Sequence, residues 1–218
     1  MRDLQENNVP SEHQNEECYF PQLNSGIRVL FVGNSITKHA PKPEIGWTND
    51  CGMEASSVDK DYVHLVEEKI REKHKDASFA ILQVADFERN FESFQIEKEH
   101  REAIDFNADI IIMFFGANVT KEYDKKSNPK ITFGERYEKL RNALNKDGKA
   151  KILHLQGFYI RPVLDAEKKK VAEKYNDEYA ELGEIRTSAD THGHFNHPND
   201  KGMADIAQLI WKIISKWV

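Results

Sequence analysis

Four apolar runs recur along this chain, and each is separated from the next by a stretch long enough to form a helix. The runs cover residues 29–32, 79–84, 110–115 and 151–155. Large apolar side chains at consecutive positions are typical of strands that are buried on both faces. Parallel strands need long crossover connections, which are usually helices. The alternation therefore predicts an α/β protein, a three-layer α/β/α sandwich around a central parallel sheet of about five strands in flavodoxin-like order.

The stretches between and after these runs carry apolar residues at helical spacing. We expect helices over residues 59–70, 91–107, 132–148 and 163–182, and from 199 onward. Asp59 is the expected cap of the first helix, and Thr132 with Glu135 forms the capping-box pattern that opens the third. A short edge strand is expected near residues 184–187, where it would complete the sheet.

The first 25 residues are polar and show no helical or strand period. We therefore expect a polar arm over residues 1–25 and one domain over residues 26–218, long enough to bury a core without disulfides or metals. The formal net charge of -6 disfavours nucleic acid and anionic membranes as partners, because both attract clustered positive charge. The longest apolar run, residues 110–115, is far shorter than the roughly 20 residues that cross a bilayer.

The N-terminus and the two cysteines bear on the compartment in which the protein works. Residues 1–8 lack the apolar centre of a signal peptide, which predicts a cytoplasmic protein, or a secreted or periplasmic one whose leader has been removed. Cys18 and Cys51 would be able to pair in an oxidising compartment, but two unlinked thiols are the favoured interpretation.

Three short polar segments are expected at the carboxyl edge of the sheet. They are residues 33–35 (Gly-Asn-Ser), 116–118 (Gly-Ala-Asn) and 197–200 (His-Pro-Asn-Asp). Each segment alone is a common turn or helix-start signal. Ligands of parallel sheets bind at this edge, because the loops there are held by rigid strands beside a crevice. Together the segments supply the hydroxyl, carboxamide and imidazole that acyl transfer requires.

Ser35 is the candidate nucleophile and His197 the candidate base, because a serine hydroxyl needs a group that accepts its proton near neutral pH. The tetrahedral intermediate carries negative charge on the former carbonyl oxygen, and the candidate oxyanion donors are the Ser35 N–H and the Asn118 amide. Asn34 and Trp47 are candidate substrate-binding residues. Trp47 lies in the long loop over residues 37–58 and is equally suited to packing that loop onto the domain.

Residues 29–37, 116–118 and 197–203 resemble, in the same order, the first, third and fifth conserved blocks of the SGNH, or GDSL-type, hydrolases. The resemblance implies an α/β/α esterase or deacylase without a metal or other cofactor, in which Ser35, His197 and Asn118 have the roles given above. Many members of that family remove acetyl or other acyl groups from carbohydrates, lipids or small esters. We therefore expect a serine esterase that cleaves an acyl ester, with acetyl favoured, of a carbohydrate or other small molecule through an acyl-enzyme.

Two departures from the family pattern leave parts of the site open. The second block usually supplies a glycine whose N–H completes the oxyanion hole, but residues 84–90 contain no glycine. The fifth block usually places an aspartate three residues before the histidine, where this chain has His194. Asp190 and Glu88 are candidates to orient His197 instead, and a backbone carbonyl is the remaining option. The alternative function is a catalytically weak or inactive domain of this fold that binds a glycan or other ligand.

Two further interpretations are less favoured. His192, His194 and His197 form a His-x-His-x-x-His pattern that invites a zinc site, but no clear acidic or cysteine partner is identifiable. A flavin or nucleotide site would suit the same topology. That site needs a glycine-rich phosphate cradle, and only Gly33 stands at the first turn.

Overall fold

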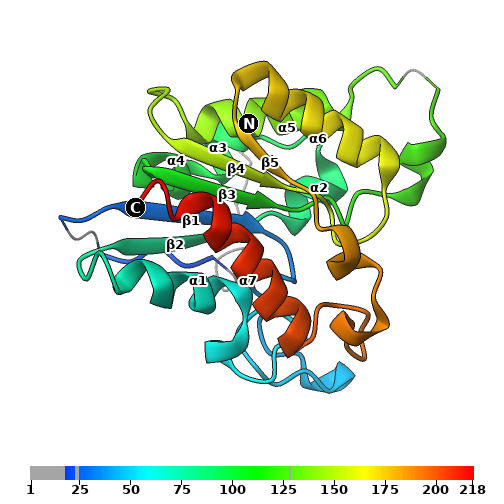
Figure 1. Ribbon diagram of the computed structural model, residues 1–218. Coiled ribbons are helices and arrows are strands. Elements are labelled where there is room, and N and C mark those ends of the chain that lie inside the picture. The colour runs from blue at the N-terminus through cyan, green and yellow to red at the C-terminus, as the bar shows by residue number, and fades with distance from the viewer. Residues whose placement is uncertain (1–17, 23–24, 128) are drawn as a thin grey trace, which may run out of the picture.

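The computed structural model describes residues 18–22, 25–127 and 129–218, so residues 1–17 and 23–24 of the expected polar arm lie outside the described residues. In the described chain, five parallel strands form one sheet in the order β2-β1-β3-β4-β5 (Figure 1). The strands are β1 (Arg28–Gly33), β2 (Ser78–Gln83), β3 (Ile110–Phe114), β4 (Lys151–Leu155) and β5 (Glu178–Ala180). The α/β sandwich and the flavodoxin-like strand order predicted from the sequence are confirmed.

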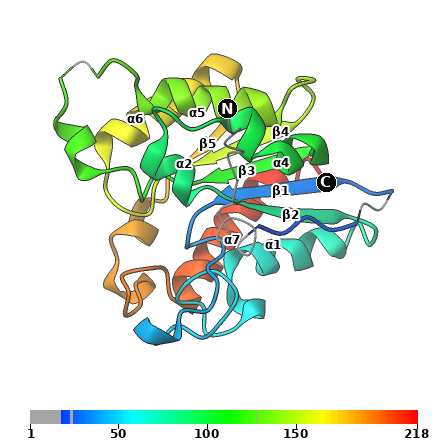
Figure 2. The same ribbon diagram turned by 180° about the vertical axis from the view of Figure 1, so that it is seen from behind.

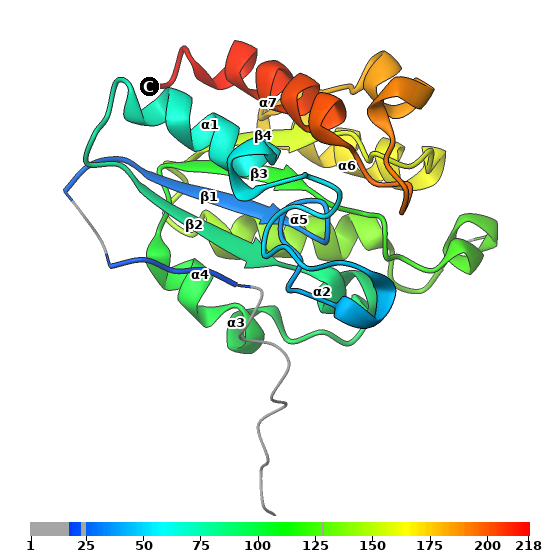
Figure 3. The same cartoon turned by 90° about the horizontal axis from the view of Figure 1, so that it is seen from below.

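Helices cover both faces of the sheet (Figures 2 and 3). One face is covered by α1 (Tyr62–Arg71) and α7 (Asp200–Ile214). The other is covered by α2 (Ala85–Asn90), α3 (Ile96–Glu99), α4 (Arg101–Phe106), α5 (Phe133–Leu144) and α6 (Pro162–Tyr175). Successive β1 side chains therefore enter two different cores, with Val29 and Phe31 in one and Leu30 and Val32 in the other. None of the described helices is long and apolar enough to span a bilayer.

The register of the central strands aligns their carboxyl ends. Gly33, the last residue of β1, pairs with Gln83 at the end of β2 and with Phe114 at the end of β3. The segments that follow these three strands therefore leave the sheet side by side at one edge. This alignment follows from parallel pairing and brings residues from distant parts of the chain to a common rim.

Side-chain caps begin α1, α5 and α7. Thr132 and Glu135 form the predicted capping box of α5, and the Asn199 side chain caps α7 by accepting from the N–H of Gly202 at 3.0 Å. The predicted cap of α1 was wrong by two residues. Asp61, rather than Asp59, accepts from the N–H of His64 at 2.8 Å, because residues 58–60 form a separate 3-10 turn before the helix.

The elements around the sheet's two edges differ from the sequence-based expectation. The segment expected to form one helix over residues 91–107 forms two short helices, α3 and α4, and the short helix α2 precedes it. Helix α6 ends at Tyr175 because Asn176 adopts a left-handed conformation with φ of 56°. The chain is then free to form β5 at residues 178–180, so the edge strand expected near 184–187 is wrong, and residues 183–186 form a 3-10 turn.

The described part of the N-terminal arm contacts β2 through one isolated bridge. The backbone of Tyr19 pairs antiparallel with that of Ile81, through N···O distances of 2.9 and 2.8 Å. Cys18 lies on this segment, while Cys51 is buried in the core between the sheet and α1 and α7. The two cysteines are not joined by a disulfide.

Candidate active site

Ser35 and His197 meet at the carboxyl edge of the sheet, although 162 positions separate them in the chain. The Ser35 Oγ lies 2.8 Å from the His197 Nε2. Ser35 follows β1 on a tight turn, in which the N–H groups of Thr37 and Lys38 both donate to the Asn34 carbonyl. The turn requires glycine at position 33, because a Cβ there would lie 1.7 Å from the Thr37 Oγ1. His197 lies just before the first turn of α7.

The second imidazole nitrogen of His197 is held by the backbone. Its Nδ1 lies 2.9 Å from the Phe195 carbonyl oxygen, and the Tyr159 hydroxyl is 3.4 Å away. Neither carboxylate that the sequence suggested reaches this ring. Asp190 is exposed, and Glu88 is buried and bound elsewhere. The Phe195 carbonyl has no side-chain signal in the sequence, so sequence analysis had no means of selecting it.

The surroundings of His197 favour the neutral imidazole. Burial lowers the pKa of this ring, and the hydrogen bond to the Phe195 carbonyl opposes that shift without reversing it. Since a carbonyl can only accept, Nδ1 must carry the proton. The unprotonated Nε2 then faces the Ser35 hydroxyl as an acceptor.

Glu88 lies fully buried behind the nucleophile, on α2. Its carboxylate accepts from the Asn118 Nδ2 at 2.6 Å, from the Asn34 Nδ2 at 3.1 Å and from the N–H of Gly116. Burial raises the pKa of Glu88, and these hydrogen bonds oppose that rise. Glu88 therefore does not orient His197, contrary to what the sequence had suggested. It binds two asparagines instead.

The two asparagines of the site have different surroundings. Asn34 is 1 % exposed and its amide points inward to Glu88, so the structure does not support the predicted contact of its side chain with substrate. Asn118 is half-buried and lies on the wall of the same cavity as Ser35 and His197. The structure thus brings Asn118 to the serine and the histidine, as the three sequence segments indicated.

Trp47 does not offer a surface to a substrate. Its side chain is 6 % exposed, packs in the core on the α1 and α7 side, and donates from Nε1 to the His39 carbonyl at 3.2 Å. The alternative interpretation, in which Trp47 packs the long loop onto the domain, is therefore correct. The loop returns to the site at Met53, whose N–H donates to the Ser35 carbonyl at 2.8 Å.

A cavity of about 810 Å³ opens at the serine and the histidine. Ser35, His39, Met53, Asn118 and His197 line one end, and residues of α2 to α4 with the described N-terminal segment line the rest. This volume lies within the range of about 300–1,000 Å³ that is typical of small-molecule sites. The wall formed by α2 to α4 was not predicted, because residues 84–90 were expected to form the segment after the second strand and residues 91–107 one weakly patterned helix.

The segment after β2, where the family pattern has its oxyanion glycine, has a different arrangement. The N–H of Ala85 donates to the Gln83 side-chain oxygen at 2.6 Å. This N–H at the start of α2 is therefore already bound within the protein. The Ala85 N–H is therefore not assigned to the oxyanion hole, and the Ser35 backbone N–H and the Asn118 amide stay the candidate donors.

The three histidines of the His-x-His-x-x-His pattern do not converge. His192 bonds through Nδ1 to the Ser188 carbonyl and packs on Phe158 with ring centroids 4.5 Å apart, while His194 is exposed. Over the residues that the structure describes, no group of three or more histidine, cysteine, aspartate or glutamate side chains is arranged to hold a metal.

Comparisons with known proteins find relatives only at the level of structure. No protein-family model matches the chain, and no curated protein sequence matches it. Among solved structures, a catalytic mutant of an acetylxylan esterase from Geobacillus stearothermophilus matches with a TM-score of 0.58 and 16% identity, over 88% of this chain and 95% of that one.

Two further solved structures have similar scores. A two-domain esterase active on acetylated mannans matches with a TM-score of 0.59 and 20% identity, over 87% of this chain and 48% of that one. A family two carbohydrate esterase from Clostridium thermocellum, in complex with cellohexaose, matches with a TM-score of 0.59 and 13% identity, over 90% of this chain and 66% of that one. The neighbours also include GDSL-like lipases from Bacteroides species. The chain therefore has the fold of the SGNH, or GDSL-type, hydrolases.

Proposed function

We propose that this protein is a serine esterase that hydrolyses an acyl ester, with acetyl favoured, of a carbohydrate or other small molecule. The observation that carries the proposal is the distance of 2.8 Å between the Ser35 Oγ and the His197 Nε2, at the end of a cavity of about 810 Å³. A hydroxyl hydrogen-bonded to an imidazole acceptor is the arrangement that activates a serine for acyl transfer. We assign the activity to the domain formed by residues 26–218.

The proposed reaction passes through two tetrahedral intermediates. The Ser35 Oγ attacks the ester carbonyl carbon while the His197 Nε2 takes the hydroxyl proton. The imidazolium then gives this proton to the departing alcohol, which leaves an acetyl group on Ser35. A water molecule, deprotonated by His197, attacks the acyl-enzyme, and the proton returns through His197 to Ser35 as acetic acid leaves and ionises in the solvent.

The oxyanion that forms in each intermediate needs fixed hydrogen-bond donors. The Ser35 backbone N–H and the second hydrogen of the Asn118 amide supply them in this proposal, since the first hydrogen is bound to Glu88. Removal of one such donor costs on the order of 10²- to 10³-fold in turnover in other serine hydrolases. Asn118 is therefore assigned as a catalytic residue.

A carbohydrate ester is the favoured substrate. The cavity has room for a sugar residue, and polar side chains such as His39, Arg89 and Asp86 share its wall with Phe94. The neighbours named as an acetylxylan esterase and as an esterase active on acetylated mannans support this class, because they share the fold of this chain.

The alternative is a domain that binds a glycan without turnover. It is favoured by one observation, namely that a backbone carbonyl rather than a carboxylate lies behind His197. A carbonyl fixes the tautomer of the ring but provides less stabilisation of the imidazolium than a carboxylate would.

Reaction with a fluorophosphonate probe, followed by mass mapping, tests the proposal without knowledge of the substrate. We expect the label on the peptide that contains Ser35, and release of acetate from a panel that includes p-nitrophenyl acetate and acetylated xylan and mannan oligosaccharides. The Ser35→Ala variant should lose both with an unchanged circular dichroism spectrum. An unlabelled wild type that is inert towards the panel but binds the oligosaccharides saturably would support the binding domain instead.

A further inference from the structure

We propose that Glu88 is a positioning residue for the oxyanion hole, whose buried carboxylate holds the Asn118 amide with its nitrogen end at the reaction centre. This inference rests on the proposed esterase function and adds a part that the three sequence motifs do not contain. Glu88 comes from α2, outside all of those motifs. Its side chain touches none of the reacting atoms, since Ser35 and His197 bond to each other and not to it.

The contacts of the carboxylate determine the orientation of the Asn118 amide. The Glu88 Oε2 lies 2.6 Å from the Asn118 Nδ2, and the Oε1 accepts from the N–H of Gly116. An ionised carboxylate only accepts hydrogen bonds, so Asn118 must turn its NH₂ group, and not its carbonyl oxygen, towards Glu88. One hydrogen of that group is bound to Glu88. The other remains for the cavity that Asn118 lines with Ser35 and His197.

Asn34 supplies a further donor to the same carboxylate. Its Nδ2 lies 3.1 Å from the Glu88 Oε1 and 3.3 Å from the Oε2. The N–H groups of Gly116 and Asn118 also donate to it, so its donors in the described part of the chain are all neutral, and no ion pair joins Glu88 to a described cation. Such hydrogen bonds favour the charged form of a buried carboxylate against the penalty of burial. An aspartate at position 34 would instead place a second carboxylate against it.

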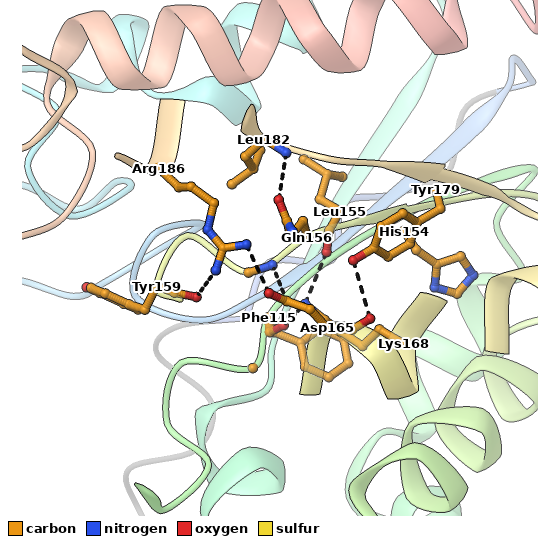
Figure 4. A network of polar contacts seen from close by, with 12 residues as sticks. Phe115, His154, Leu155, Gln156, Tyr159, Asp165, Lys168, Tyr179, Leu182 and Arg186 are labelled. Carbon is orange, nitrogen blue, oxygen red and sulfur yellow. Dashed lines mark hydrogen bonds and ion pairs between the residues drawn. The ribbon is translucent and has the colours of Figure 1, made fainter. Parts of the chain in front are cut away.

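The turn that carries Asn118 is held from its other side by a buried cation. The Lys168 Nζ donates to the Phe115 carbonyl at 3.0 Å and to the Leu155 carbonyl at 3.1 Å, as Figure 4 shows, and lies 3.5 Å from Asp165. The Phe115 carbonyl and the Gly116 N–H belong to one peptide group. That group therefore lies between the ammonium of Lys168 on α6 and the carboxylate of Glu88 on α2.

A peptide held at both ends by opposite charges is polarised, which strengthens both of its hydrogen bonds. These two hydrogen bonds also connect α2 and α6 to the segment that follows β3, where Gly116 has φ of 132°. We infer that the pair prevents the segment over residues 116–118 from rotating when an oxyanion forms beside Asn118. Preorganised donors stabilise a developing charge without reorganisation during the reaction.

A double-mutant cycle on acetyl ester hydrolysis tests this role. In Glu88→Gln, the side-chain oxygen is expected to keep the Oε1 position, which accepts from the N–H of Gly116. The new amide nitrogen then takes the Oε2 position and meets the Asn118 Nδ2, so the Asn118 amide turns over and places its oxygen where its nitrogen was. We expect kcat to fall on the order of 10²- to 10³-fold, with KM within about threefold of the wild-type value. Asn118→Ala should cost a similar factor. The double variant should be no worse than the poorer single variant, to within about threefold, because both changes remove the same interaction.

A purely structural Glu88 would give a different result. The losses of the two single variants would then multiply in the double variant, and that outcome would overturn the proposal. Glu92→Gln is the matched control, because Glu92 is an exposed carboxylate paired with Lys126 and lies outside the cavity wall. Its kcat should equal that of the wild type.

A measurement on the wild-type protein covers the case in which Glu88→Gln fails to fold or the wild type lacks esterase activity. The side-chain amide signals of Asn118 are assigned by their absence in the Asn118→Ala spectrum. We expect one of its two protons to be shifted downfield and to exchange slowly, because it is bound to a buried carboxylate. Signals at ordinary positions that exchange as fast as those of exposed asparagines would contradict the positioning role, whatever the enzyme assays show.

Discussion

The Nδ1 atom of His197 lies 2.9 Å from the carbonyl oxygen of Phe195, two residues earlier in the chain. The ring is therefore held by the loop from which it projects, and not by a carboxylate from another element. This contact sets the tautomer that an accepting Nε2 requires, but adds no full negative charge to stabilise the protonated ring. The acid–base behaviour of the site follows from this arrangement.

The esterase activity should fall at a more acidic pH than the usual pKa of an imidazole would give. The proposed reaction needs neutral His197, and burial lowers the pKa of this ring below its usual value of about 6.5. The acid limb of kcat/KM should therefore have its midpoint below pH 6.5. The measurement is a pH profile of acetyl ester hydrolysis from pH 4.5 to 8. An acid limb centred above pH 7 would indicate a carboxylate partner that raises the pKa.

Substitution of Asp190 should leave activity unchanged. Its side chain is exposed, and neither a hydrogen bond nor an ion pair joins it to His197. We expect kcat/KM of Asp190→Asn to equal that of the wild type to within about twofold, whereas His197→Ala should lose on the order of 10⁴-fold or more. A loss of comparable size in Asp190→Asn would mean that the loop closes onto the ring during catalysis.

Trp47→Ala should act on stability and not on substrate affinity. The indole is buried in the core, and its removal should lower the free energy of unfolding by about 3–5 kcal/mol. Urea unfolding measures this loss. Ile45→Ala, an exposed position on the same loop, should change stability by less than about 0.5 kcal/mol. A selective rise in KM with unchanged stability would restore the substrate-binding interpretation of Trp47.

Asp177 is expected to contribute a pH-dependent part of the stability. Asp177 directly precedes β5. Its two oxygens bind Arg141 of α5 at 2.9 Å, and one of them binds His154 of β4 at 3.0 Å. Asp177→Ala leaves the buried Arg141 without its partner, and should cost about 3–5 kcal/mol in urea unfolding. Asp205→Ala removes an exposed pair with Lys201 and should cost less than about 1 kcal/mol.

The sign of the pH effect at Asp177 follows from the direction of its shift. Burial opposes ionisation of this carboxyl, but the hydrogen bonds from His154 and Arg141 outweigh it and lower the pKa below 3.8. The stabilisation is therefore complete above the unfolded pKa of about 3.9 and is lost as the pH falls through the lower folded value. The difference in unfolding free energy between wild type and Asp177→Ala should shrink only in that acid range. A difference that already declines between pH 7 and 5 would contradict this account.

Local patterns identified most of the elements. The strand formed by Lys151–Leu155 and the capping box at Thr132 were predicted without knowledge of the fold. Burial on both faces and helix capping each require particular residue types within a few consecutive positions. The wrong predictions of elements concern two places. Strand β5, at one edge of the sheet, has three residues and no apolar run, and helices α2 to α4 are too short to show a helical period.

The sequence by itself determined that Ser35, Asn118 and His197 would reach one rim. Each follows a strand or opens a helix, and parallel pairing sends all of those ends to the same edge of the sheet. Only the tertiary structure decided what lies behind these groups, namely the Phe195 carbonyl at His197 and the Glu88 carboxylate at Asn118. A backbone carbonyl carries no side-chain signal, and the partner of a buried carboxylate depends on which elements pack around it. Those contacts arise from packing between distant segments, on which local periodicity has no bearing.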